Sequence, residues 1–296
     1  MANITSAQLA TIPTIVAAEA LGYLKNNTVM ARLVARDWDN EVARYGQTIK
    51  IQYPGTLAAN TKSEGSTITL NQPTAGEYTV TLNQHKEVSF LIEDFGRFLA
   101  RPDWFKTYME TAMMVLAETI DGALTALYAG FSQTIDASTG LGEDDFRLAR
   151  RYLNTAKAPL GQRYAVLHED AEYEALAIER LVNRDYAESL GSMAANSYVN
   201  RAYGFDIFMS QSIKTSTTLK NMFFQRNAMV LATRPLATAP EGMGVVQRTM
   251  NEDGIGLRVT MSYDHDYLGG KVTVDVLYGV AELRDNHGVV VSTADL

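Results

Sequence analysis

Asp264-His265-Asp266 is the triplet whose residue types best suit a metal site, because carboxylate and imidazole groups bind several divalent ions. In an extended segment, however, successive side chains point to opposite faces. The two aspartates would then face one way and the histidine the other, so the three groups converge poorly. A solvated turn between two strands explains the triplet better, and we predict no metal site here.

The acidic run Glu143-Asp144-Asp145 could supply the paired carboxylates of an acid/base catalyst. It also stands at the start of a predicted helix that closes near Arg150 and Arg151. Negative charge at the start of a helix and positive charge at its end is the order that the helix dipole favours. We therefore assign this run to helix stability rather than to catalysis.

Other motifs of catalytic or cofactor sites lack their structural context. The glycine pairs at 242/244 and 254/256 are not followed by a helix, as a phosphate-binding loop would be. His85, His168 and His287 are scattered over separate predicted elements. The sequence contains no Gly-x-Ser-x-Gly and no His-Glu-x-x-His motif. It thus predicts neither an enzyme nor a cofactor.

The composition is that of an ordinary globular protein of 296 residues, with 46% hydrophobic and 20% charged residues. A net charge of −8 argues against a protein that coats nucleic acid. It does not argue against a protein that encloses nucleic acid, because a mildly acidic protein surface repels the phosphates and does not bind them tightly. The absence of cysteine excludes disulfides and thiolate metal sites.

No membrane contact is expected from the sequence. The apolar stretch from Ile12 to Leu24 has no leading basic region and contains Pro13 and Glu19, so it does not suit a secretory signal. No run approaches the roughly twenty apolar residues that a transmembrane helix needs.

Residues 48–92 form a strand, a polar loop and a returning strand. Residues 49–53 alternate strictly between apolar and polar, and the alternation returns over 78–82 and 88–92. Residues 54–76 are mostly small and polar. Each limb could extend about 40 Å, and a two-stranded arm of this kind is marginal alone in water. We expect it to be too thinly apolar to fold against its own domain and to lie on another copy of the protein.

A long helix is predicted over residues 103–129. Apolar residues recur every three or four positions from Phe105 to Leu127, Glu118 and Asp121 stay off that face, and Gly130 ends the pattern. At 1.5 Å per residue the helix would be about 40 Å long, which suits a subunit that must span distance.

From residue 141 onward the pattern is mixed α/β, and residues 1–47 form an arm that we expect to lie across other parts of the chain or other subunits. Helices are predicted near 143–151 and 169–182, and strands at 164–168, 205–209, 223–232, 257–263 and 271–280. The last two strands suggest a hairpin. Residues 183–204 are predicted to form a loop, and residues 240–256 a glycine-rich connection.

The order of arm, long hairpin, long helix, α/β lobe and returning strand pair resembles that of phage major capsid proteins with the HK97-type fold. The local sequence is similar to the branch that includes the P22 coat protein. The similar segments run from Val29 to Asp37, from Gly46 to Ile51, from Phe224 to Leu236 and from Gly256 to Val280. The resemblance therefore covers nearly the whole chain.

The resemblance implies an α+β chain with the HK97-type capsid fold, divided into four parts. These are an N-terminal arm (1–47), an extended loop hairpin (48–93), a peripheral domain with a spine helix (94–140 and 255–278) and an axial domain (141–254 and 279–296). The sequence has no large N-terminal extension of the kind that acts as a built-in scaffold in some relatives, so a separate scaffolding protein is implied. There is also no room for the additional domain inserted in the P22 protein.

On this resemblance we expect a major capsid protein that forms pentamers and hexamers in an icosahedral shell around the double-stranded DNA of a tailed phage. A portal protein and DNA bound without sequence specificity would be its other partners. The shell would assemble in the host cytoplasm and remain in the virion. The candidate interface residues lie on the arm and the hairpin: Arg32, Arg36, Trp38, Tyr53, Lys62, Glu64, Ile68, Leu70 and Tyr78.

Lys62 and Glu64 lie where the hairpin tip should be. Some capsid relatives join a loop lysine covalently to an asparagine on a neighbour. This sequence identifies no partner asparagine and no activating carboxylate, so we expect both side chains to be solvated or to form ion pairs worth ~0–1 kcal/mol.

Two alternatives remain open at this point. A bacterial nanocompartment shell of the same fold would carry an enzyme as cargo. An α/β enzyme or ligand-binding protein could use the hairpin as a dimerisation arm, but it would need a convergent polar pocket that the sequence does not reveal.

Overall fold

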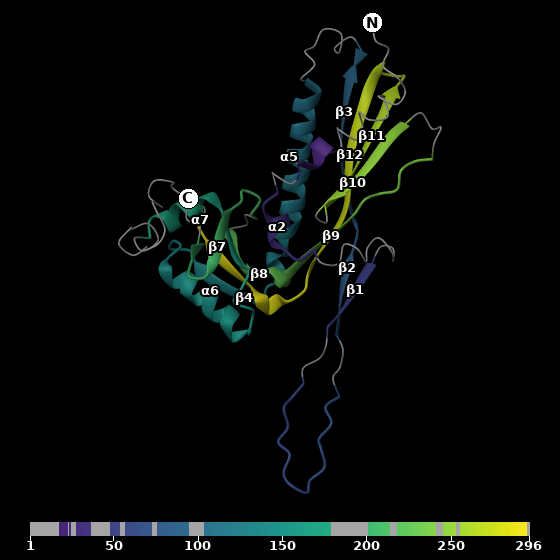
Figure 1. Cartoon of the computed structure of the whole chain (residues 1–296). Coiled ribbons are helices and arrows are strands. Elements are labelled where there is room, and N and C mark those ends of the chain that lie inside the picture. The colour runs from purple at the N-terminus through teal and green to yellow at the C-terminus, as the bar shows by residue number, and fades with distance from the viewer. Residues whose placement is uncertain are drawn as a thin grey trace.

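The computed structural model shows an upright sheet with a long helix along it, a second α/β lobe beside the lower end of that sheet, and a hairpin that projects away from both (Figure 1). The described residues are 18–22, 24, 28–36, 48–53, 57–72, 76–94, 104–178, 201–213, 218–240, 245–252 and 255–294.

The upright sheet is antiparallel, with the strand order β10-β11-β12-β3 and with β9 pairing with β12. Its strands are β3 (Gln84–Glu93), β9 (Met229–Arg234), β10 (Val245–Glu252), β11 (Ile255–Asp264) and β12 (Gly269–Glu282). Apolar side chains share one face because the register sets like residues opposite one another. Val88 lies opposite Val274, and Phe90 lies opposite Val272.

The long helix α5 (Trp104–Thr125) covers this apolar face. The prediction of a helix over 103–129 is confirmed, except that its end tightens into the 3₁₀ helix η1 (Ala126–Gly130). The buried stripe on α5 comprises Met109, Ala112, Met113, Leu116, Ala117, Ile120 and Leu124. These residues belong to the same core cluster as the apolar strand residues of the sheet.

By length and composition alone, the segment Tyr108–Gly130 is long and apolar enough to cross a membrane. The prediction that no run approaches this limit is therefore wrong by that measure. Of the apolar window, 44% is buried inside the chain itself. A large part of the apolar surface of α5 therefore packs inside the protein, against the sheet.

The second lobe contains a six-stranded sheet in the order β4-β13-β8-β5-β7-β6. Its strands are β4 (Gln133–Ala137), β5 (Arg163–Leu167), β6 (Arg201–Ala202), β7 (Phe205–Met209), β8 (Leu219–Gln225) and β13 (Gly288–Thr293). Its helices are α6 (Glu143–Thr155) and α7 (Glu169–Leu176). Phe223 anchors the core, where Phe146 and Phe205 each pack edge-on at 5.2 Å between ring centroids.

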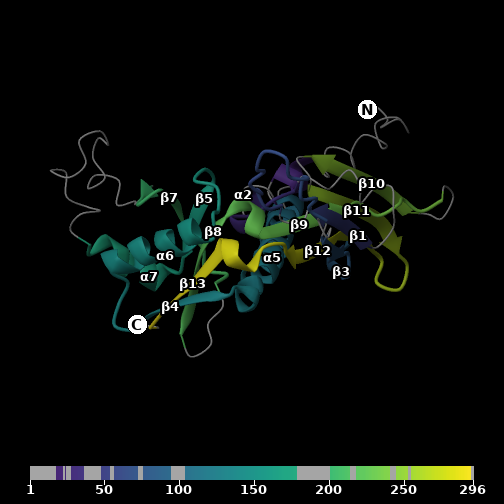
Figure 2. The ribbon, with the colours of Figure 1, turned by 90° about the horizontal axis from the view of Figure 1, so that it is seen from below.

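Seen from below, the two sheets lie side by side rather than stacked (Figure 2). The predicted strand over 223–232 is wrong as one element, because the chain leaves one sheet and enters the other there. β8 ends at Gln225, the 3₁₀ helix η3 (Arg226–Ala228) turns the chain, and β9 begins at Met229. Each half is apolar enough to be buried, which is why the sequence reads as one continuous strand.

The prediction of a glycine-rich connection over 240–256 is also wrong in part, because that stretch includes β10. This strand carries Gln247, Arg248 and Asn251, so it shows no apolar run. It forms because its backbone pairs with β11 along the strand, from Val245 opposite Ser262 onward. Pairing with a strong neighbouring strand has overridden a weak local signal.

The projecting hairpin is rooted in its own chain, contrary to the expectation that it is too thinly apolar to fold there. Its strands are β1 (Thr48–Tyr53) and β2 (Gly76–Thr81). At the root, Ile49, Ile51, Val80 and Leu82 pack against Val230, Ala232 and Leu283. Gly279 of β12 allows this close approach, since a Cβ there would lie 2.3 Å from the carbonyl oxygen of Thr81.

The described part of the arm lies in the core beside α5. The short helix α2 (Met30–Leu33) buries Met30, Ala31 and Leu33. Ala35 then forms a parallel bridge to Val230 of β9, with its backbone N–H donating to the carbonyl of Met229 at 3.1 Å.

Candidate assembly surfaces

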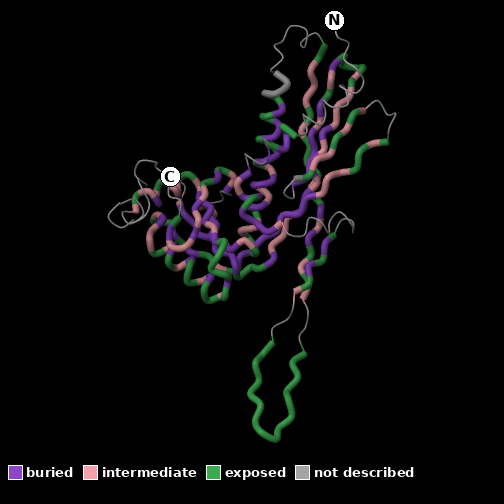
Figure 3. The backbone as a smooth tube through the Cα atoms, in the orientation of Figure 1, coloured by how far each residue is buried: buried purple, intermediate pink, exposed green. Residues whose placement is uncertain are grey.

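Residues 57–72 form a loop that is exposed along its whole length (Figure 3). The loop extends beyond the last paired residues of β1 and β2, so no ladder of backbone hydrogen bonds holds it. Three large apolar side chains are nevertheless held in solvent, with Leu57 68%, Ile68 66% and Leu70 80% exposed. Apolar side chains gathered on one projecting ribbon indicate a contact surface.

The loop closes in a tight turn from Ser63 to Ser66. The backbone N–H of Ser66 donates to the carbonyl of Ser63 at 3.2 Å, and the Ser66 hydroxyl donates to the same oxygen at 2.8 Å. Gly65 has a φ of +78°, which a glycine adopts without strain. The structure places Lys62 and Glu64 at this tip, both exposed.

Two asparagines join the limbs behind the tip. The Asn60 amide donates to Asn71 Oδ1 at 3.3 Å, and the Asn71 amide donates to the carbonyl of Ala58 at 2.6 Å. These side-chain bonds take the place of a strand ladder and keep the limbs side by side. Both asparagines therefore link one limb to the other.

The sequence of the loop predicts two chemically different faces. If each limb is extended, alternate residues point to opposite sides, so Lys62 is expected on the side of Asn60 and Asn71. The same alternation predicts that Leu57, Ile68 and Leu70 share the other side. An apolar side of this kind suits a ribbon that lies flat on a partner.

Tyr53 and Tyr78 lie at the root of the hairpin rather than on its projecting part. Their rings stack at 4.4 Å between centroids with an interplanar angle of 26°. Burial and the neighbouring Tyr53 raise the pKa of Tyr78 above its usual value. Beside them Lys50 Nζ lies 2.8 Å from Glu77 Oε1, an exposed pair worth little stability. The stacked rings stiffen the point from which the loop projects.

The arm residues do not join the hairpin group. Arg32 is exposed on α2, and its Nε donates to the carbonyl of Thr28 at 3.0 Å. Arg36 is half-buried just after the bridge to β9. Trp38 lies outside the described residues. The structure thus separates the predicted interface residues into a hairpin group and an arm group.

Asp121 is an anchor for the arm that the sequence did not reveal, and its expected place off the buried face of α5 is wrong. It is 2% exposed. Its carboxylate accepts the backbone N–H of Val29 at 2.7 Å and that of Ala31 at 3.3 Å, at the start of α2. Burial raises the pKa of Asp121 to about 6, against the lowering effect of these backbone bonds and of Arg32.

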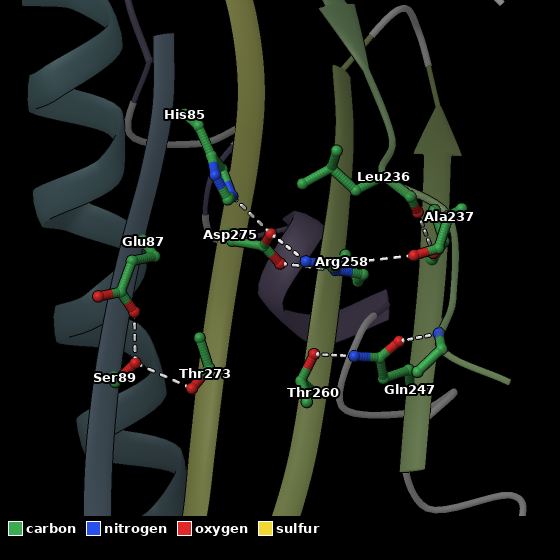
Figure 4. Close-up of polar contacts among 12 residues, drawn as sticks. His85, Glu87, Ser89, Leu236, Ala237, Gln247, Arg258, Thr260, Thr273 and Asp275 are labelled. Carbon is green, nitrogen blue, oxygen red and sulfur yellow. Dashed lines mark hydrogen bonds and ion pairs between the residues drawn. The ribbon is translucent and has the colours of Figure 1, made fainter. Parts of the chain in front are cut away.

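The sheet face turned away from α5 is polar, and its contacts hold the strand connection before β10 (Figure 4). Asp275, 3% exposed, lies 2.8 Å from His85 Nε2 and accepts from Arg258 at 2.7 Å and 3.0 Å. Arg258 also donates to the carbonyl of Ala237 at 2.8 Å. Gln247 accepts the backbone N–H of Ala239. These bonds link β3, β12 and β11 to the connection before β10, so they hold that connection against the sheet.

The residues singled out for chemistry have structural roles. Asp264 accepts the N–H of Asp266 at 3.0 Å in the turn between β11 and β12, and the ring of His265 packs against Tyr263. The predicted solvated turn is confirmed. Asp145 accepts the N–H of Gly142 at 2.8 Å at the start of α6, which confirms the helix-start role. Within the described residues no three His, Asp or Glu side chains are grouped to hold a metal ion.

Further large apolar side chains are exposed at separate places on the molecule. The outer side of α5 presents Tyr108, Met114 and Val115, each nearly half exposed. The β11–β12 turn presents Tyr267 and Leu268. Leu160 and Tyr173 are exposed on the second lobe. Exposed apolar residues scattered in this way are normal on a protein surface, so the group on the projecting loop is the stronger candidate for a contact surface.

No protein-family model matches this sequence. No curated protein sequence matches it either. Its likeness is to solved structures. One from Mycobacterium phage Che8 is 17% identical with a TM-score of 0.67, and the match covers 89% of this chain and 90% of that one. The capsid of cyanophage P-SCSP1u is 15% identical with a TM-score of 0.63, over 85% of each chain.

A third structure, a virus-like particle from Pyrococcus furiosus, is 10% identical with a TM-score of 0.54. That match covers 94% of this chain and 98% of the other. The chain therefore has the fold of subunits that build closed protein shells. More particularly, it has the fold found in phage capsids, including those of P-SCSP1u, PhiM1 and GP4.

Proposed function

We propose that this chain is a major capsid protein that self-assembles into an icosahedral shell around the double-stranded DNA of a tailed phage. The observation that carries the proposal is the projecting loop, which holds Leu57, Ile68 and Leu70 in solvent, on a chain with the phage capsid fold. A solvent-exposed ribbon with an apolar face has no use in an isolated subunit. It acquires one when the ribbon lies on the next copy.

Assembly then follows from geometry rather than from chemistry, and we propose no enzymatic activity. The apolar face of the loop covers part of a neighbouring subunit, the second lobes meet around five- and six-fold centres, and the arm contributes further contacts. Each contact is modest, but a closed symmetric shell engages all of them together.

The chain divides by its two sheets into the HK97-type domains. The upright sheet with α5 as the spine helix is the peripheral domain, and the lobe around α6 and α7 is the axial domain. Sheet membership, from which we infer these domains, differs from the expected bounds at four places. Residues 84–93 of the expected loop hairpin and 229–252 and 279–282 of the expected axial domain lie in strands of the upright sheet, and residues 133–137 of the expected peripheral domain form β4 of the second lobe.

The proposed partners follow from the same function. Copies of the chain form pentamers and hexamers, a separate scaffolding protein guides their curvature, and a portal protein occupies one vertex. With a net charge of −8, the chain would hold packaged DNA without sequence-specific binding. Assembly takes place in the host cytoplasm, and the product is the virion capsid.

Electron microscopy of loop variants tests the proposal directly. The full chain, expressed with its scaffolding protein, should give closed shells in negative stain. Replacing residues 54–76 by a short Gly-Ser turn should leave folded subunits that form no shells. The substitutions Leu57→Ser, Ile68→Ser and Leu70→Ser together should have the same effect.

The matched control alters the tip without touching the apolar face. Lys62→Ala with Glu64→Ala should still give normal shells, because both side chains lie at the tip, apart from Leu57, Ile68 and Leu70 in the sequence of the loop. Two results would refute the proposal. One is normal particles from the triple serine variant, and the other is a small fixed oligomer from the full chain under every condition.

The second candidate function is a nanocompartment shell with an enzyme as cargo. The likeness to the virus-like particle from Pyrococcus furiosus covers nearly all of both chains. The contents of purified shells separate the two functions. Nucleic acid and a portal ring support the phage capsid, whereas a single encapsulated enzyme without nucleic acid supports the nanocompartment.

A further inference from the structure

Tyr53 of β1 and Tyr78 of β2 meet at the root of the hairpin, below the upright sheet (Figure 1). The register sets Tyr53 opposite Gly76, two positions before Tyr78, so the two tyrosines are diagonal neighbours on one face of the strands. Their rings stack with centroids 4.4 Å apart and an interplanar angle of 26°. The ring carbons of one phenol therefore lie close to those of the other.

Gly76 fixes the position of the Tyr53 ring. A Cβ at residue 76 would collide with Cε1, Cζ and the hydroxyl oxygen of Tyr53, so the phenol end of that ring lies directly on the bare backbone of β2. Cε1 is a ring carbon next to the one that carries the hydroxyl. The structure thus holds this carbon against the strand that carries Tyr78.

The hydroxyl ends of the two rings also lie near each other. Burial raises the pKa of Tyr78 most, and Tyr53 raises it further through its charge and a side-chain hydrogen bond. Both residues are partly exposed, so a reagent in solution can reach them. Tyr173 and Tyr267 are far more exposed, at 71% and 64%, and they serve as the measure of what exposure alone would give.

We propose that Tyr53 and Tyr78 are a site of oxidative cross-linking, at which a one-electron oxidant joins the two rings as dityrosine. Each phenol gives one electron to the oxidant and one proton to water. The two phenoxyl radicals then form a carbon–carbon bond between ring carbons beside the hydroxyls, and the hydrogens on those carbons move to the oxygens, which restores both aromatic rings. A peroxidase supplies the oxidant, because hydrogen peroxide takes up the two electrons and two protons and leaves as two molecules of water.

The new bond closes residues 53–78 into a covalent ring at the base of the projecting loop. β1 and β2 then stay joined at this point even where the exposed loop beyond them is cut. This property belongs to the single chain and does not depend on the proposed shell function.

Tryptic peptides report the bond in the full purified chain. Tyr53 and Tyr78 fall in different peptides, 51–62 and 63–86. After treatment with a peroxidase and hydrogen peroxide, mass spectrometry should find these two peptides joined, with a mass lower than their sum by two hydrogen atoms. Brief trypsin treatment of the native chain gives a second readout. Cleavage after the exposed Lys62 separates the two halves of the untreated chain, whereas the halves of the cross-linked chain should stay together in a denaturing gel.

Variants assign the product to the stacked pair. Tyr53→Phe and Tyr78→Phe each keep an aromatic ring but remove one phenol, so each should abolish the joined peptides. Gly76→Ala keeps both phenols and displaces the Tyr53 ring, so the yield should fall several-fold. Gly270→Ala, where nothing lies within 4 Å of the new atom, is the matched control and should leave the yield unchanged. In a mixture of chains with light and heavy nitrogen, both joined peptides should come from the same chain.

Four results would overturn the proposal. The first is no joined peptide at a peroxide level that couples free tyrosine in the same reaction, and the second is joined peptides that combine light and heavy chains. The third is an undiminished yield in Gly76→Ala. The fourth is coupling that favours Tyr173 or Tyr267 over this pair, because exposure rather than the stacked geometry would then decide the product. The two phenylalanine variants and the isotope mixture keep the test decisive even where Gly76→Ala fails to fold.

Discussion

Replacing Asp121 with asparagine should remove one pH dependence from the stability of the folded chain. The Asp121 carboxylate is 2% exposed and is held by backbone N–H groups at the start of α2. Those bonds favour the charged form, but burial disfavours it more strongly. The pKa of Asp121 is therefore about 6 in place of its ordinary 3.8. Asparagine keeps one acceptor at this place and cannot titrate.

The size and sign of the effect follow from the two pKa values. Between pH 3.8 and pH 6 the folded chain binds more protons than the unfolded chain, so its stability falls as the pH rises. The whole effect is about 3 kcal/mol, since each pKa unit corresponds to about 1.4 kcal/mol. About 1.3 kcal/mol of it is lost between pH 5 and pH 7.

Urea unfolding of the unassembled subunit at pH 5 and pH 7 measures this quantity. The free energy of unfolding of the parent chain minus that of Asp121→Asn should be about 1.3 kcal/mol larger at pH 5 than at pH 7. All other titrating groups cancel in that difference. Glu110→Gln, an exposed change on the same helix, should leave the pH dependence unaltered. A difference that stays constant within about 0.3 kcal/mol would refute the assignment of a buried, titrating anchor.

Three further predictions concern other contacts. Gly279→Ala should destabilise the subunit by roughly 1–3 kcal/mol in urea unfolding, because its Cβ would lie 2.3 Å from a backbone carbonyl of β2. Gly270→Ala on the same strand, with nothing within 4 Å of the new atom, should be nearly neutral. Asp275→Asn should cost about 3 kcal/mol, since it leaves a largely buried arginine without its carboxylate, whereas Glu77→Gln at an exposed pair should cost less than about 1 kcal/mol. Boiled particles should run as one band near 32.6 kDa in a denaturing gel. A ladder of heavier bands would instead show a covalent bond between subunits, with Lys62 the first residue to substitute.

Strong periodic patterns made much of the fold predictable. Three patterns predicted the right element: the spacing along α5, the alternation of β1, β11 and β12, and the acidic start of α6. Each pattern is regular over enough residues to be distinguished from a chance arrangement. The hairpin tip also fell where the polar segment placed it. The path between the sheets was not predictable, because β8 and β9 are both buried and read as one strand.

The most informative site residues were hidden for a physical reason. Asp121 is a polar side chain in a buried place, and the pattern of a helix or strand assigns such a residue to the surface. Its role depends on backbone groups far away in sequence, such as the N–H of Val29, 92 positions from Asp121. The asparagine pair in the loop was equally invisible, since the bonds of Asn60 and Asn71 depend on how two limbs align.

The place of β13 in its sheet has a consequence for protein synthesis. β13 lies between β4 and β8, and all six of its residues are buried. It is also made after every other described strand. Until those residues leave the ribosome, β4 has no neighbouring strand and the lobe is split. A nascent chain therefore cannot present a finished lobe to its neighbours on the same messenger RNA, so contacts that need the complete lobe form only after synthesis ends.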